Sequence, residues 1–127
     1  MQCRGIRGAI TVSANDKESI LAATGKLLME MALANKIAIE DIAAIFFTTT
    51  PDLNAEFPAS ATRELGWPSN LALLCGHEMN VQNDLPRCLR VLILVNTDKG
   101  PEEIMHVYLG EAKKLKDKPP PSIGGDI

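Results

Sequence analysis

Aromatic side chains are scarce in this sequence. They make up 4% of the 127 residues, with a single tryptophan and a single tyrosine, so the core must pack mainly from aliphatic side chains. Basic residues are also in the minority, because 13 Lys and Arg stand against 16 Asp and Glu and give a formal net charge of −3. This balance argues against non-specific nucleic-acid binding, and no nucleic-acid partner is expected. The length is that of one domain.

Cysteines are few and long apolar runs are absent. Cys3, Cys75 and Cys88 are an odd number at scattered spacings, with no CxxC pair. A disulfide framework or a zinc knuckle is therefore not expected, and a reducing cytoplasm is favoured. The run VLILV at 91–95 is far too short to cross a bilayer, and the first residues lack the apolar run of a signal peptide. We expect a cytoplasmic protein with no membrane partner.

Familiar motifs of cofactor and hydrolase sites are missing. The sequence has no Walker loop and no GxGxxG, HExxH or GxSxG pattern. The stretch CGHEM (75–79) leaves two alternatives open: Cys75 as a nucleophile with His77 or His106 as its base, or a metal site from these residues and Glu78. Neither is favoured, because the spacing matches no known pattern. No cofactor and no metal are expected.

The pattern of apolar residues predicts a mixed sheet. Residues 4–12 (RGIRGAITV) alternate, with Ile6 and Ile10 on an apolar face and Arg7 on the other face beside the small Gly5 and Ala9. A helix is expected to follow, from an Asn15–Glu18 capping-box spacing to about residue 35. The further expected elements are strands at 44–49, 71–75, 87–97 and 107–115, short helices within 57–66 and 100–106, and a Pro- and Gly-rich tail at 118–127.

This order of elements, βαβαββαβ, predicts one domain over residues 1–117. The expected class is α/β (α+β), a mixed β-sheet with helices on one face. The strand at 87–97 is apolar on both faces apart from Arg90, so it is expected to be central and buried. The other face of the sheet is left uncovered, and we conjecture that an oligomer covers it.

Arg90 is the most informative charged residue. It lies in the middle of a strand, where a guanidinium needs a partner, either a structural carboxylate such as Glu78 or a bound anion. Tyr108 shares its expected strand face with Gly110 and Ala112. Like Arg7, it is therefore a single polar side chain among small residues. Each position alone has an ordinary structural explanation. Three of them on separate strands favour a pocket for a negatively charged ligand.

Several long segments together resemble a known family. They are RGIRGAITV, TTTPDLNAEFPASATRELGW (48–67), CGHEM, RCLRVLILVNTD (87–98) and HVYLGEA (106–112). In this order they are similar to the monofunctional chorismate mutases of the small trimeric α/β (pseudo-α/β-barrel) type. The resemblance runs from about residue 3 to residue 117.

The resemblance implies an isomerase that needs no cofactor. Its family rearranges the chorismate dianion to prephenate, on the shikimate route to phenylalanine and tyrosine, in a homotrimer with barrel-like packing of sheets and active sites at subunit clefts. By position, Arg7 and Tyr108 would hold carboxylates, Arg90 would reach the ether oxygen, and Glu78 and Cys75 would lie near the ring hydroxyl. The remaining substrate-binding positions that it implies are Leu74, Gly76, His77, Phe57, Ala59, Arg63 and Lys116, with Arg90, Glu78 and Arg7 as the catalytic set.

Two positions depart from the family pattern, and two other functions are weighed. Lys116 stands where family members tend to have arginine, and Ser60 stands where they often have lysine. At substrate entry, Lys116 keeps the positive charge but lacks the forked donors of an arginine. One alternative is a trimeric imine deaminase of the RidA type, and another is a non-catalytic small-molecule-binding module. The combination of Glu78, Arg90 and Tyr108 speaks against the deaminase.

Overall fold

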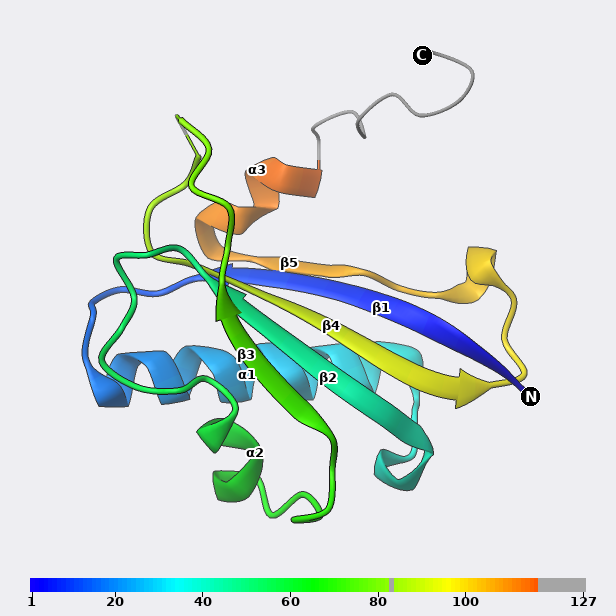
Figure 1. The fold of residues 1–127 in the computed structure, drawn as a ribbon. Helices are drawn as coiled ribbons and strands as arrows, with labels where there is room; N and C mark the ends of the chain where they lie inside the picture. The colour runs from blue at the N-terminus through cyan, green and yellow to red at the C-terminus, as the bar shows by residue number, and fades with distance from the viewer. Residues whose placement is uncertain (83, 117–127) are drawn as a thin grey trace.

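A single five-stranded sheet organises the chain. The computed structural model describes residues 1–82 and 84–116, and its strands lie in the order β3-β2-β4-β1-β5 (Figure 1). β4 pairs antiparallel with β1 and with β2, whereas β3 and β5 are parallel edge strands. The expected mixed sheet is therefore confirmed. Its strands are β1 (Gln2–Thr11), β2 (Ile42–Thr49), β3 (Leu73–His77), β4 (Cys88–Thr97) and β5 (Val107–Leu109).

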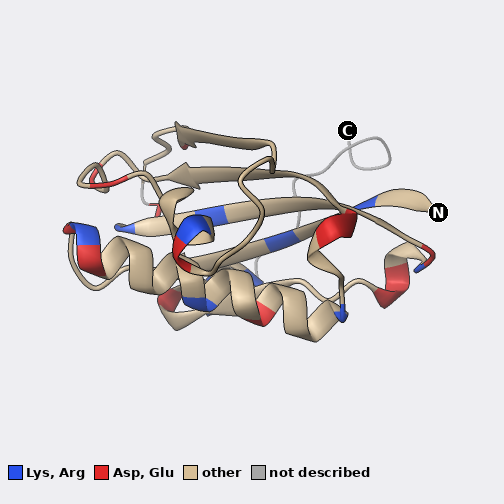
Figure 2. Cartoon of the chain, turned by 90° about the horizontal axis from the view of Figure 1, so that it is seen from below, with Lys and Arg blue, Asp and Glu red and all other residues tan. Residues whose placement is uncertain are grey.

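The long helix α1 (Lys17–Asn35) packs along one face of this sheet, and the opposite face carries no helix of comparable length (Figures 1 and 2). Two short helices, α2 (Ser60–Glu64) and α3 (Lys113–Lys116), complete the helical part. The helix expected within 100–106 is a single 3₁₀ turn, Pro101–Glu103. No helix among the described residues is long and apolar enough to span a membrane. The expected tail at 118–127 lies outside the described residues.

The core lies between α1 and the sheet. Ile6 and Ile10 are buried there, as the alternation of β1 predicts. Gly8 lies between them on the same face, where a Cβ atom would collide with Sδ of Met31 on α1. The glycine therefore lets the helix approach the strand closely, and Met31 is fully buried as a result.

The start of α1 differs from the expectation. The helix is capped by Asp16, whose side chain accepts a hydrogen bond of 2.7 Å from the N–H of Ser19, and not by Asn15. This bond lowers the pKa of Asp16. Asn15 lies one residue outside the helix, and its side-chain oxygen accepts from the N–H groups of Asn54 and Ala55 at 3.0 and 3.1 Å. The capping-box interpretation was therefore wrong by one residue.

Three strand predictions also need correction. β5 ends at Leu109 and not at residue 115, because Gly110 adopts a φ of 59° and turns the chain into a 3₁₀ turn. Ala112 therefore does not share a strand face with Tyr108. β3 begins and ends two residues later than expected, so Gly76 lies inside the strand. β4 is central as expected, but it is not buried on both faces, because Leu92 is exposed in the chain by itself.

A buried asparagine anchors the segment before β5. The side chain of Asn35, at the end of α1, donates 2.9 Å to the carbonyl of Met105 and accepts 2.8 Å from its N–H. It also donates 2.8 Å to the carbonyl of Met31. These bonds satisfy a buried amide and fix the chain three residues before Tyr108. The short edge strand therefore starts from a rigid point.

Candidate active site

One row of paired residues crosses the whole sheet. The register aligns one position from each strand, in the order Tyr108, Ala9, Arg90, Thr48 and Gly76. These positions alternate with core residues such as Ile10 and Phe47, so they lie on the face that α1 leaves open. Neighbouring strands are about 4.8 Å apart, which places the backbones of Tyr108 and Arg90 about 10 Å apart across the small Ala9.

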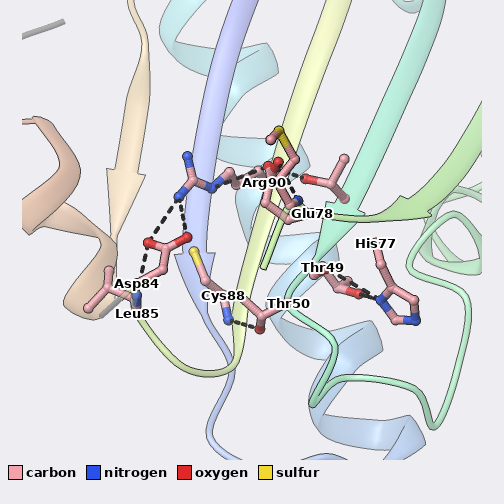
Figure 3. Close-up of polar contacts among 10 residues, drawn as sticks. Thr49, Thr50, His77, Glu78, Asp84, Leu85, Cys88 and Arg90 are labelled. Atoms are coloured by element: carbon pink, nitrogen blue, oxygen red, sulfur yellow. Dashed lines mark hydrogen bonds and ion pairs between the residues drawn. The ribbon is translucent and has the colours of Figure 1, made fainter. Parts of the chain in front are cut away.

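Arg90 lies between two carboxylates (Figure 3). Its Nη2 is 3.3 Å from Oδ2 and 3.4 Å from Oδ1 of Asp84, and its Nε is 3.7 Å from Oε2 of Glu78. Nε is buried and has no hydrogen-bond partner among the described residues. Leaving such a donor unsatisfied is costly, so this atom is suited to an acceptor on a ligand. The sequence predicted the Glu78 partner, but it did not predict Asp84.

Glu78 is fixed by its neighbours. Its Oε2 accepts a hydrogen bond of 3.1 Å from Oγ1 of Thr48, and its Oε1 accepts 3.0 Å from the N–H of Met79. Its own N–H donates 2.7 Å to the carbonyl of Thr49, just beyond β3. Thr48 was not predicted from the sequence, since only the pairing of β2 with both β3 and β4 places it between Gly76 and Arg90.

Arg7 lies on the same open face as Arg90, two residues before Ala9 on β1. Arg7 pairs with Leu92, so Arg7 and Arg90 are diagonal neighbours on β1 and β4. Diagonal neighbours are about 7–8 Å apart, which allows two arginine side chains to reach one ligand. The N–H of Arg7 donates 2.9 Å to Nδ1 of His106, just before β5. Burial, and then the charge of Arg7, lower the pKa of His106 below its ordinary value. His106 is therefore neutral near pH 7, with Nδ1 free to accept this bond.

Cys75 and His77 lie away from this cluster. Cys75 pairs with the buried Phe47, so its side chain is on the α1 side of β3. His77 contacts Oγ1 of Thr49 at 3.2 Å, apart from Arg90 (Figure 3). Burial raises the pKa of the Cys75 thiol more than contact with the Ala59 backbone lowers it. A reactive thiolate needs the opposite shift, so the nucleophile alternative is not supported.

The remaining predicted residues divide between two regions. Leu74 pairs with Phe46 and is exposed on the open face, two residues before Gly76. Phe57 lies in a second region, where residues 54–58 and 75–77 line an open pocket, and Ala59 follows directly. Arg63 on α2 and Lys116 at the end of α3 are both exposed, and the chain by itself does not bring them to Arg90. Among the described residues, no group of three His, Cys, Asp or Glu side chains is placed to hold a metal ion.

Comparisons with known proteins identify the family of this chain. The family model described as "Chorismate mutase type I" matches residues 3–118. The chain belongs to the chorismate mutase type I family. It is 47% identical over 114 residues to chorismate mutase AroH of Thermus thermophilus, covering 89% of this chain and 93% of the relative. It is 40% identical over 116 residues to chorismate mutase AroH of Bacillus subtilis, covering 91% of each.

A solved structure extends the similarity to the fold. Chorismate mutase from Clostridium thermocellum superposes with a TM-score of 0.86 at 50% identity, covering 88% of this chain and 99% of that one. Membership of the chorismate mutase family makes the chain an isomerase that acts on chorismate to give prephenate. It favours the resemblance found in the sequence over the imine deaminase and binding-module alternatives.

Proposed function

We propose that the chain binds the chorismate dianion on the open face of the sheet and rearranges it around Arg90. The observation that carries this proposal is the buried Nε of Arg90, which has no hydrogen-bond partner among the residues that the structure describes and lies at the centre of a row that also holds Tyr108. Arg7 lies beside this row on the same face. Two forked cations and a phenol hydroxyl on neighbouring strands are donors of the kind that two carboxylates and an ether oxygen require.

The reaction itself explains why no nucleophile or general base is needed. In the rearrangement of chorismate, the ether C–O bond breaks while a C–C bond forms within the same molecule, and no proton changes place. The protein must hold the compact conformer and stabilise the negative charge that builds on the ether oxygen. We assign Arg90 to this oxygen and an adjacent carboxylate, Arg7 and Tyr108 to the carboxylates, and Glu78 to the ring hydroxyl.

The magnitudes are consistent with one dominant donor. An acceleration at the low end of the enzymatic range corresponds to about 8 kcal/mol of barrier reduction. One donor aimed at a developing oxyanion supplies about 3–4 kcal/mol of such a reduction. Positioning of the compact conformer by Arg7, Tyr108 and Glu78 accounts for the rest.

We further propose that the active site is completed by a second copy of the chain in a homotrimer. The open face exposes Phe46, Leu74 and Leu92, an apolar surface that association would bury. Phe57 and Cys75 lie in the other region, away from Arg90, so within one chain the predicted residues form two incomplete halves. We assign Phe57, Ala59, Arg63 and Cys75 to the neighbouring copy's site, with Arg63 and Lys116 drawing in the dianion.

In this proposal the product prephenate feeds the synthesis of phenylalanine and tyrosine, in the cytoplasm. The two relatives named chorismate mutase AroH support this role, because the chain matches each of them over more than nine-tenths of its length. The Lys116 position keeps the charge that substrate entry requires, but it lacks the forked donors of an arginine.

The test is turnover of chorismate by the purified chain. We expect consumption of chorismate and formation of prephenate without added metal or cofactor, by a protein that sediments as a trimer. A folded trimer that leaves chorismate unchanged would contradict the activity. Full activity in a monomer would contradict the shared site and leave the activity itself standing.

A further inference from the structure

Two carboxylates share Arg90, and the mechanism above uses only one of them. Glu78 lies on the Nε side of the guanidinium, whereas Asp84 lies against Nη2 with both of its oxygens within 3.4 Å. With both acids ionised, this cluster carries a net charge of −1. A dianionic substrate that approaches Arg90 therefore meets repulsion unless one acid gives way.

The two acids are anchored very differently. Glu78 is fixed by Thr48 from β2 and by the N–H of Met79. The carboxylate of Asp84 accepts one bond outside the ion pair, 2.9 Å from the N–H of its own neighbour Leu85. Among the described residues, the Asp84 side chain makes no other hydrogen bond. Asp84 is therefore the acid that can leave the guanidinium at the smaller cost.

The position of Asp84 on the guanidinium matters as much as its charge. An arginine binds a carboxylate through two parallel N–H donors, and each edge of the fork serves one partner at a time. The carboxylate of Asp84 occupies the Nη2 donor of Arg90, and the substrate carries the same kind of group. The buried Nε faces Glu78 at 3.7 Å without a hydrogen bond, so it stays available for the ether oxygen.

We propose that Asp84 is an internal competitor for Arg90, a carboxylate that substrate must displace from Nη2 and that thereby sets the affinity of the site for dianions. This inference rests on the proposed function, and it adds a residue that determines affinity without taking part in the reaction. Asp84 lowers affinity while leaving the rearrangement step itself unchanged, since the competitor has left Arg90 once substrate is bound.

The test compares Asp84→Asn with a matched charge change elsewhere. Asp84→Asn keeps the size of the side chain and the oxygen that accepts from Leu85. It removes the negative charge that Asp84 places against the guanidinium of Arg90. We expect KM to fall about three- to fivefold, the scale of a partly exposed ion pair, with kcat unchanged. Asp98→Asn is the control, because Asp98 pairs with the N-terminal amine and lies beyond the far end of β4. It makes the same change in net charge, and KM should stay as it was.

A binding measurement separates this inference from the proposed activity. Malonate, a simple dicarboxylate, is titrated calorimetrically into the wild type, Asp84→Asn and Asp84→Ala. Both variants should bind malonate more tightly than the wild type, and the difference should shrink at high salt. Tighter malonate binding with no turnover of chorismate by the wild type would remove the proposed function and keep Asp84 as a competitor.

Three results would overturn the inference. Unchanged KM and unchanged malonate affinity in both variants would show that the ion pair does not oppose binding. A raised KM would show that Asp84 helps to hold substrate. A lower kcat at constant KM would show that Asp84 orients Arg90 for the reaction and does not compete for it.

Discussion

The two faces of the sheet are built from adjacent residues of the same strands, yet they serve different ends. Phe47 of β2 is 1% exposed against α1, while its neighbour Phe46 is 37% exposed on the open face. Ile93 and Leu92 of β4 repeat this contrast at 0% and 36%. The helix side is a closed aliphatic core, and the open side combines apolar side chains with Arg7 and Arg90.

This difference shows how stability and function are separated at single-residue spacing. Successive side chains of a strand point to opposite faces, so a change at one position acts on the core and a change at the next acts on the site. Substitutions on the helix side should alter the free energy of unfolding. Substitutions on the open side should alter catalysis or association and leave folding nearly intact.

The largest effect is expected at the centre of the open face. Arg90→Ala removes the donor for the ether oxygen, and kcat should fall by at least about 10²–10³-fold while the fold survives. Arg90→Lys should also be severe, because a point charge lacks the forked donors. Steady-state kinetics on chorismate and circular dichroism check both. Arg4→Lys is the control, since Arg4 bonds the carbonyl of Lys99 outside the site. Near-normal turnover in a folded Arg90→Ala variant would refute the assignment.

Adjacent residues of β4 test the contrast directly. Ile93→Ala leaves a cavity in the closed core and should lower the free energy of unfolding by about 2–5 kcal/mol. Leu92→Ala should cost less than about 1 kcal/mol in the chain itself, because its side chain is already partly exposed. It should instead weaken association, seen by analytical ultracentrifugation. Equal losses in urea unfolding at one protein concentration would contradict the separation of the two faces.

Two glycines of β1 provide a smaller version of the same test. An alanine at Gly8 would push into the fully buried Met31, so Gly8→Ala should destabilise by about 1–3 kcal/mol. An alanine at Gly5 would meet Cδ1 of Leu92 at 3.3 Å and Cδ2 of Leu94 at 3.8 Å, two side-chain ends on the open face that can shift. Gly5→Ala should therefore change the free energy of unfolding by less than about 1 kcal/mol. Denaturant unfolding of both variants measures this, and the opposite ranking would be inconsistent with the packing described above.

The smallest expected effect is a dependence on pH at the edge of the open face. The folded-state pKa of His106 lies below its unfolded value of about 6.5, so the unfolded chain binds the proton first. The stability from neutral His106 is fully present above that value and is lost as pH falls through the folded-state pKa. His106→Gln keeps an acceptor for the N–H of Arg7 but does not titrate. Its unfolding free energy should fall less than that of the wild type between about pH 7 and pH 5.

Periodicity and composition predicted the parts of the fold that depend on local pattern. Alternation in β1 correctly separated Ile6 and Ile10 from Arg7, and the apolar run of β4 correctly indicated a central strand. The end of β5 was not predicted, because the chain turns left-handed at Gly110 and the next N–H, of Glu111, bonds Oγ1 of Thr11 on β1, far away in the sequence. The helix cap moved from Asn15 to Asp16 for a similar reason, since Asn15 is engaged by the distant segment at 54–55.

The site was predicted by residue type more than by arrangement. Arg90 with Glu78 emerged from the need of a strand arginine for a partner, and the structure confirms that contact. Thr48 and Asp84 were not predicted. Thr48 becomes a neighbour of both residues only through the sheet register, and Asp84 reaches Arg90 from a loop whose path no periodicity describes.

The place of β2 between β3 and β4 has a consequence for how this enzyme can evolve. Thr48, from a strand earlier in the chain, lies between Glu78 and Arg90, and within the described part of the loop that joins them only Met79 holds Glu78. Substitutions in this loop after Met79 can therefore accumulate while Thr48 keeps the two residues side by side. Because Asp84 lies in this loop, selection can adjust how tightly substrate is held while the reacting groups keep their places.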